Sequence, residues 1–176
     1  MTDVFGQAAR SQIKDDPVET FYIRNGSEFR EATSEEIIAR AQALISQRFR
    51  IGSKLMSNPD FTAAFLRLHL GTLDYEVFGV LYLDSRLRLI AIEDMFRGTI
   101  DGASVYPREI AQAVLKHRAV SVILYHNHPS GVAEPSVADE AITRKIQGAL
   151  QLLDVKVLDH LIVAENTFSF SKAGLL

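Results

Sequence analysis

The feature that most constrains the fold is a strand-length run, Ala119 to Tyr125, that carries no charge and leads directly into His126-Asn127-His128-Pro129. Apart from Ser121, every residue of the run is apolar or aromatic. Such a run must be covered on both faces, as a central strand is in a layered α/β sheet. It is far shorter than the roughly 20 residues that cross a bilayer. We therefore expect a buried strand whose far end carries two histidines.

The pattern on either side of this run predicts an α/β fold with a mixed central sheet flanked by helices. Asp84-Ser85 is a turn signal between two apolar runs, which indicates a hairpin. Pro107 and Ser136 stand where helices begin, and the second of these helices should extend to about Leu152. From residue 75 onward the expected order is strand, strand, helix, strand, helix, strand, strand, with strands over 77–83, 87–92, 119–125, 155–164 and 167–170. The segment from His126 to Pro135 is expected to be a loop.

The first 57 residues predict a separate, smaller region. We expect a mobile arm over residues 1–20, then a short strand over 21–23 that turns at Asn25-Gly26. Thr33 and Glu36 fit a capping box at the start of a helix that ends near residues 48–50. Asn58-Pro59 opens the next helix. The expected division is an N-terminal arm and helical appendage over residues 1–57 and a main domain over 58–176.

Composition excludes several classes of function. The chain has no cysteine, so it forms neither a disulfide framework nor a cysteine-ligated zinc site. This also excludes the zinc deaminases, which require a Pro-Cys-x-x-Cys motif. The net charge is −3 and no basic stripe is visible, so DNA binding is not supported. No signal peptide or membrane span is visible, and we expect a cytoplasmic protein.

His126 and His128 predict half of a metal site. Residues two apart on a strand point to the same face, so the two imidazoles face the same way. Ser136 and Asp139 follow at the start of the next helix, where the chain can return Asp139 to the histidines. Two histidines and one carboxylate leave the fourth tetrahedral position open, as a catalytic zinc requires. Taken alone, Ser-x-x-Asp is better explained as a helix cap, and His-x-His as a polar strand end. The two roles of Ser136 and Asp139 are compatible.

The sequence resembles a known family at these residues. The pattern His126-x-His128-Pro129 followed by Ser136-x-x-Asp139, with seven residues between His128 and Ser136, is similar to the JAMM motif of MPN-fold zinc metalloproteases. The resemblance is closest to the bacterial RadC-like branch and runs from about residue 58 to the C-terminus. The matching stretches are Glu76-Val77-Phe78, Phe96-Arg97-Gly98-Thr99, Val105-Tyr106-Pro107-Arg108-Glu109, His126-Asn127-His128-Pro129-Ser130-Gly131, Leu153-Asp154-Val155 and Asp159-His160-Leu161-Ile162-Val163.

The resemblance implies an MPN (JAMM) fold, with layering like that of cytidine deaminases, and a role for each site residue. His126, His128 and Asp139 would bind Zn²⁺. Glu76 would act as general acid/base, and Ser136 would hydrogen-bond the oxyanion. Without the resemblance, Glu76 would count as a strand-end charge. The implied activity is zinc-dependent hydrolysis of amide bonds, as in a metalloprotease or isopeptidase, on a protein or peptide substrate.

Some alternatives stay open at this stage. The chain could be a non-catalytic MPN-like interaction protein in DNA repair or mobile-element maintenance. The helix-hairpin-helix region of full-length RadC proteins is not visible in the first 57 residues, and the oligomeric state is not defined. His160 could line the pocket or orient a ligand, or it could be a satisfied core histidine. Asn127 is expected to face away from the two histidines, outside the set of ligands.

Overall fold

The computed structural model describes residues 20–25, 28–48, 51–52, 59–71, 73–98 and 105–176. Contacts divide the chain into two compact units, residues 1–40 and 41–176. The expected arm over residues 1–20 lies almost entirely outside the described residues, as do Gly26 of the expected turn and the expected division between residues 57 and 58. None of the helices in the described part of the chain has the length and apolar content needed to cross a membrane.

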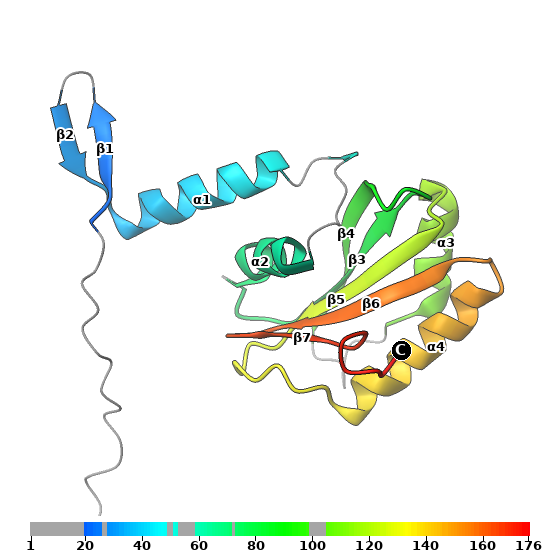
Figure 1. Cartoon of the computed structure of the whole chain (residues 1–176). Coiled ribbons are helices and arrows are strands. Elements are labelled where there is room, and N and C mark those ends of the chain that lie inside the picture. The colour runs from blue at the N-terminus through cyan, green and yellow to red at the C-terminus, as the bar shows by residue number, and fades with distance from the viewer. Residues whose placement is uncertain (1–19, 26–27, 49–50, 53–58, 72, 99–104) are drawn as a thin grey trace, which may run out of the picture. The chain divides into compact units, whose positions relative to one another are not determined.

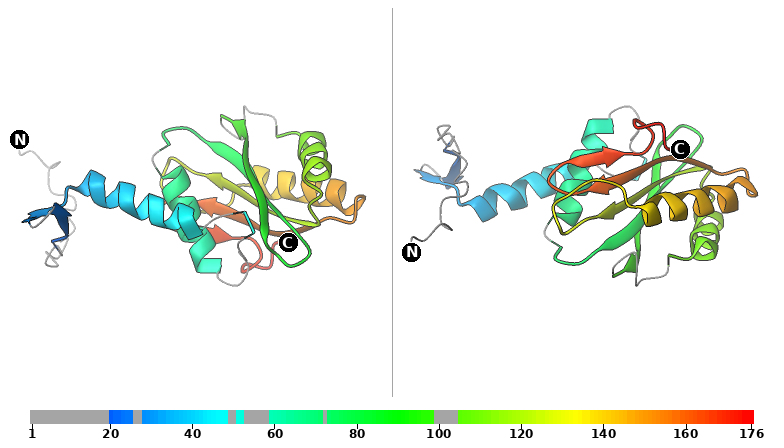
Figure 2. Two further views of the ribbon diagram at one scale, coloured as in Figure 1. Left: turned by 90° about the horizontal axis from the view of Figure 1, so that it is seen from above. Right: turned by 90° about the horizontal axis from the view of Figure 1, so that it is seen from below.

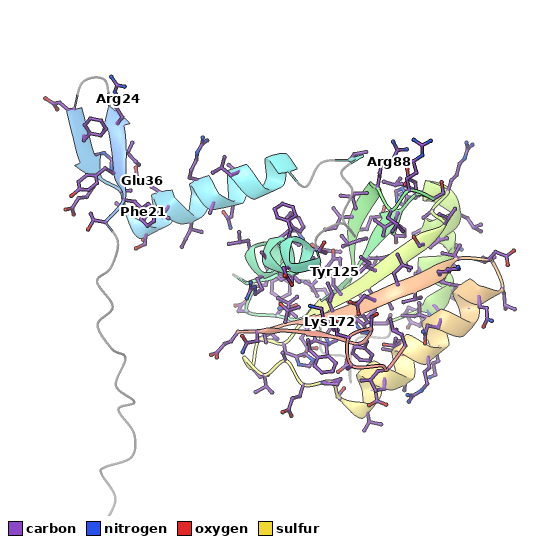
Figure 3. All side chains as sticks on the ribbon, in the orientation of Figure 1. Phe21, Arg24, Glu36, Arg88, Tyr125 and Lys172 are labelled. Atoms are coloured by element: carbon purple, nitrogen blue, oxygen red, sulfur yellow. The ribbon has the colours of Figure 1, made fainter. Side chains whose placement is uncertain are left out.

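The first unit contains a hairpin of β1 (Tyr22–Asn25) and β2 (Glu28–Glu31), followed by α1 (Ser34–Arg48), which continues into the second unit. The capping box is confirmed: Glu36 N donates to Thr33 Oγ1 (3.3 Å) and Thr33 N donates to Glu36 Oε2 (3.0 Å). Figure 3 labels Glu36 at this helix start. The strand β2 was not predicted, because all of its side chains are exposed and its sequence lacks an apolar face.

The second unit is built around a five-stranded sheet with the order β4-β3-β5-β6-β7 (Figure 1). The pair β5–β6 is parallel and the other three pairs are antiparallel. This confirms the α/β class and the mixed sheet. The strands are β3 (Val77–Leu83), β4 (Leu89–Arg97), β5 (Ser121–Asn127), β6 (Lys156–Val163) and β7 (Thr167–Ser169).

Helices cover both faces of this sheet (Figure 2). The helix α2 (Pro59–Leu70) packs through Leu66 and Leu70 on one face. The helices α3 (Pro107–His117) and α4 (Val137–Gln151) pack on the other. Both faces of β5 are therefore buried, as its apolar sequence predicted. Ile123 and Tyr125 belong to the core under α2, and Val122 and Leu124 to the core under α3 and α4.

The expected boundaries of two strands are wrong at both ends, and β5 begins at Ser121 rather than at Ala119. The strand expected over residues 87–92 is β4, which begins at Leu89 and continues to Arg97. It starts late because Leu87 is in the left-handed region (φ 59°) of a turn in which Asp84 accepts from the backbone N–H groups of Arg86 and Arg88. The loop expected from His126 begins one residue after Asn127 instead, because His126 and Asn127 still pair with β6.

Gly79 on β3 shows how tightly this sheet is packed. A Cβ atom at Gly79 would overlap the ring and hydroxyl of Tyr125, the residue labelled on β5 in Figure 3. The Tyr125 ring cannot swing away freely, because its hydroxyl donates to Asp94 Oδ1 on β4. Only glycine therefore fits at this position without displacing a buried ring.

We expect Gly79→Ala to lower the free energy of unfolding by about 1–3 kcal/mol, the usual cost of overpacking a core. Gly148→Ala is the matched control, because a Cβ at Gly148 meets nothing within 4 Å and the residue lies within α4. Replacing a helical glycine by alanine should stabilise the protein by about 0.5–1 kcal/mol. Denaturant titration of both variants measures the difference. A Gly79→Ala protein as stable as the Gly148→Ala protein would contradict this packing.

Candidate metal centre

The strand β5 carries His126 into the interior at the carboxyl end of the sheet. Its side chains alternate between the two cores, and His126 falls on the same side as Val122 and Leu124, under α3 and α4. It pairs with Phe78 of β3, whose ring stacks against the imidazole at 6.1 Å between centroids. His126 is completely buried. A buried imidazole needs a polar partner at each nitrogen, so the contacts of both nitrogens identify its role.

His128 lies just beyond the strand and is fixed by backbone groups. Its N–H donates to Val163 O (2.9 Å), which continues the pairing with β6. Its ring Nδ1 lies 2.8 Å from Val132 O. A carbonyl oxygen only accepts, so Nδ1 carries the hydrogen. In neutral His128, therefore, Nε2 carries a lone pair that is directed away from Val132.

Asp139 is the third residue of α4 and is held by the cap of that helix. Ser136 is the N-cap: its Oγ accepts from Asp139 N (3.1 Å), and its own N–H and hydroxyl both donate to Asp139 Oδ2 (2.7 Å each). This reciprocal capping box fixes the carboxylate in one rotamer while leaving its second oxygen, Oδ1, turned toward the histidines. The expected cap and the expected metal ligand are thus the same side chain.

The three predicted ligands converge. The Nε2 atoms of His126 and His128 are 2.9 Å apart, His126 Nε2 is 3.2 Å from Asp139 Oδ1, and His128 Nε2 is 3.7 Å from Asp139 Oδ2. Zinc ligands at about 2.0–2.1 Å in a tetrahedral site lie roughly 3.3 Å from one another. The spacing of the three groups therefore fits one small cation.

Too few hydrogen-bond donors are present where the three candidate ligands meet. Asp139 Oδ1 is buried and has no hydrogen-bond partner in the described part of the chain. It faces Nε2 of His126, while the other carboxylate oxygen, Oδ2, faces Nε2 of His128, which carries only a lone pair when neutral. Buried acceptors that meet without hydrogens between them repel one another unless a cation joins them. This orphaned oxygen is the observation that makes the site suitable for a metal ion.

The electrostatics agree with this arrangement. Burial by itself raises the pKa of Asp139, but its contacts with His126 and His128 outweigh burial and hold the pKa well below its ordinary value. The same carboxylate raises the pKa of His128. In contrast, burial lowers the pKa of His160 well below its ordinary value, which keeps that ring neutral. The site thus combines a carboxylate that stays ionised with an imidazole, that of His128, that attracts either a proton or a metal.

Glu76 immediately precedes β3 and is half-buried beside the three ligands. Because Phe78 pairs with His126, Glu76 is two residues further toward His128 on the same face of the sheet. Glu76 and His126 line one cavity of about 10 Å³, roughly the space of a single water molecule. The predicted acid/base residue and the predicted ligands thus lie at the same end of the central strands.

Asn127 faces away from the two histidines, as expected, yet it holds the backbone on both sides of Glu76. Its Oδ1 accepts from Val77 N (2.7 Å) and its Nδ2 donates to Tyr75 O (3.0 Å). The carbonyl of Glu76 itself accepts from Gly98 N (3.0 Å). No local pattern predicts these contacts, because the partners are 50 and 52 residues away in the chain. Asn127 therefore fixes the position of Glu76 relative to the ligands without touching them.

His160 is not a free core histidine. It is completely buried on β6, and its Nε2 lies 2.8 Å from Nδ1 of His126. Its other nitrogen, Nδ1, lies 2.6 Å from Oγ1 of Thr143 on α4. Of the two interpretations open from the sequence, the structure places His160 directly behind a predicted ligand. Thr143 was not predicted, since a threonine within an amphipathic helix carries no signal of its own.

Comparison with known proteins gives one family. The model of the RadC-like JAB domain matches residues 56–175. Among similar curated proteins, a UPF0758 protein of Thioalkalivibrio sulfidiphilus is 49% identical over 145 residues, which is 82% of this chain and 65% of the relative. A UPF0758 protein of Nitrosococcus oceani is 53% identical over 123 residues, 69% of this chain and 55% of the relative. One of Vibrio cholerae is 45% identical over 141 residues, 80% and 89% of the two chains. The chain thus spans 55–65% of the length of the first two relatives.

Purified protein should contain about one zinc per chain, because three protein ligands converge on one point. We expect His126→Ala, His128→Ala and Asp139→Asn each to reduce zinc occupancy sharply, since two remaining ligands hold zinc poorly. His69→Ala is the matched control: His69 is a half-exposed histidine on α2 that contacts Asp94 and none of the ligands. Elemental analysis after dialysis measures occupancy. Full occupancy in a His126→Ala/His128→Ala protein would remove both residues from the site.

Proposed function

Because the chain belongs to the family of RadC-like JAB domain proteins, we propose that it is a zinc-dependent amide hydrolase of the metalloprotease or isopeptidase type. The observation that carries the proposal is the buried Asp139 carboxylate, whose orphaned Oδ1 faces Nε2 of His126 and whose Oδ2 lies 3.7 Å from Nε2 of His128. A structural zinc takes four protein ligands, whereas a catalytic zinc takes three and keeps one position open. The described residues offer three candidate ligands. The substrate class we propose is a protein or peptide.

His126, His128 and Asp139 would hold the zinc in this proposal. When bound, zinc acts as a Lewis acid and lowers the pKa of a coordinated water from 15.7 to about 7. The buried walls of the site strengthen this effect, because charges interact more strongly where bulk water is excluded. Phe78, stacked on His126, forms part of that wall.

Glu76 moves the proton in this proposal. Its carboxylate accepts a proton from the attacking water, and the same carboxylic acid then donates that proton to the nitrogen of the departing amine. The position of Glu76 supports this role: it lies two residues before Phe78 on the face that carries His126, and its charge acts on His128. A general base must lie within hydrogen-bond reach of the water. Asn127 and Gly98 support it as well, since they hold the backbone at residues 75–77 in one place.

Ser136 is the proposed hydrogen-bond donor to the oxyanion of the tetrahedral intermediate. Its cap function uses the oxygen of the hydroxyl, which accepts from Asp139 N, and leaves the hydroxyl hydrogen available for exchange. That hydrogen bonds to Asp139 Oδ2, which also accepts from Ser136 N. The hydroxyl can therefore turn to a substrate oxygen without leaving Oδ2 unpaired. One such donor contributes about 2.7–4 kcal/mol to stabilising the transition state.

The rival proposal from another class is an MPN-like interaction protein without turnover, in DNA repair or mobile-element maintenance. In that case Asn127 and Gly98 would have only a structural role, and Glu76 would transfer no proton. The two proposals differ in what Glu76→Gln does. The amide of glutamine keeps the size and polarity of the side chain but does not accept the proton of a water molecule.

We expect Glu76→Gln to retain zinc and to abolish hydrolysis, because it removes the base and none of the three candidate ligands. The zinc-loaded protein is incubated with a panel of peptides and lysine-linked isopeptides, and cleavage is followed by mass spectrometry. Glu93→Gln is the control, because Glu93 is a glutamate on β4 that contacts Lys116 and His117. Near wild-type cleavage by Glu76→Gln would exclude Glu76 from the chemistry. Absence of cleavage by zinc-loaded wild type across the panel would favour the interaction protein.

A further inference from the structure

A line of buried polar groups leads from His126 back to the start of α4. Nδ1 of His126 lies 2.8 Å from Nε2 of His160, and Nδ1 of His160 lies 2.6 Å from Oγ1 of Thr143. The Thr143 hydroxyl in turn lies 2.6 Å from the carbonyl oxygen of Asp139. All four residues are at most 1% exposed. We call this line the relay; it joins β5, β6 and α4 beneath the candidate metal ligands.

The relay has a direction that follows from hydrogen counting. A carbonyl oxygen only accepts, so Thr143 gives its single hydroxyl hydrogen to Asp139 O. The oxygen of Thr143 must then accept from His160, whose Nδ1 carries the hydrogen. A neutral His160 with its hydrogen on Nδ1 has a lone pair on Nε2, and that lone pair accepts from Nδ1–H of His126. His126 therefore carries its hydrogen on Nδ1, and its Nε2 presents a lone pair to Asp139 and His128.

The opposite direction exchanges one hydrogen bond for another, because Nε2 of His126 would then donate to Nε2 of His128, 2.9 Å away. If Thr143 donated to Nδ1 of His160, its bond to the carbonyl of Asp139 would be lost. His160 would then donate from Nε2 to His126, and His126 would place an N–H, rather than a lone pair, among the candidate ligands. That tautomer does not bind a metal through Nε2.

Aromatic rings prevent the relay from finding other partners. Phe170 stacks on His160 at 4.8 Å between centroids, and Phe78 meets the same ring edge-on at 5.4 Å. Both phenylalanines and His160 itself are buried, so bulk water does not reach the imidazole. His160 can therefore satisfy its two nitrogens only through His126 and Thr143.

We propose that Thr143 and His160 are positioning residues that hold His126 in the tautomer able to bind a metal. The inference rests on the metal-binding part of the function proposed above. The relay ends on the backbone of Asp139, the residue whose carboxylate faces His126 from the other side. The start of α4 thus sets both the position of one candidate ligand and the tautomer of another.

The direct test reads the tautomers in metal-free protein. Long-range ¹H–¹⁵N correlation spectra of the full chain labelled at histidine distinguish Nδ1–H from Nε2–H. They are recorded near pH 8, where an ordinary histidine with a pKa of about 6.5 is neutral. We expect Nδ1–H in both His126 and His160. Nε2–H in either ring of the wild-type protein would overturn the proposal, whether or not the protein binds zinc.

Substitution then tests the hydroxyl. Thr143→Val keeps the shape and removes the hydrogen bonds, whereas Thr143→Ser keeps the hydroxyl. We expect Thr143→Val to weaken zinc binding about 10–100-fold in chelator competition, as is usual for partners behind a metal ligand, and to change the His160 tautomer signal. Thr143→Ser should restore both. Thr62→Val is the control, a buried threonine on α2 under the opposite face of the sheet.

The outcomes separate the two proposals. Unchanged zinc affinity and unchanged tautomers in Thr143→Val would overturn the relay while leaving the zinc hydrolase intact. A wild-type protein that binds no zinc would overturn the zinc hydrolase, and the tautomers of the metal-free protein would still decide the relay. If Thr143→Val does not fold, the spectrum of the wild type and the zinc affinity of Thr143→Ser remain decisive.

Discussion

The site depends on the crossover from β5 through α4 to β6. A parallel pair of strands needs such a connection, and its helix must return across the sheet and begin near the carboxyl end of the first strand. Here β5 ends in His126 and Asn127, and Asp139 in the first turn of α4 comes into contact with His126. Every further element of the site is added to this unit: β3 brings Glu76 to one side of His126, and β6 brings His160 to the other.

The cost of burying an unpaired polar atom explains why the polar groups at this site bond to one another and why a single unpaired oxygen is informative. A buried polar atom left without a partner costs about 1–3 kcal/mol. Around the site, Asn127, Thr143 and His160 each avoid this cost through contacts with backbone or with one another. Asp139 Oδ1 is the exception among the site residues. A cation between it and the two imidazoles would give Oδ1 a partner. A proton on His128, whose pKa the Asp139 carboxylate raises, competes with that cation.

The sequence predicted those parts of the structure whose cause is local. The apolar run before His126 predicted β5 and its central position, because a strand between two helical layers is apolar on both faces. Ser136-x-x-Asp139 predicted the start of α4, because a capping box is a pattern of neighbouring residues. The resemblance to a family added Glu76, for which no local pattern argues. The contacts of Asn127 and Thr143 were not predicted, because their partners lie 50 and 17 residues away in the chain. The strand β2 escaped because no core lies behind it.

The claim that the rest depends on is the position of the metal between β5 and α4. Anomalous diffraction from crystals of the full chain grown with zinc, measured on both sides of the zinc absorption edge, locates the ion without assuming its ligands. We expect one strong anomalous peak per chain, bounded by Nε2 of His126, Nε2 of His128 and Oδ1 of Asp139. A zinc peak elsewhere in the chain, with hydrogen-bonded water or nothing between those three atoms, would contradict it.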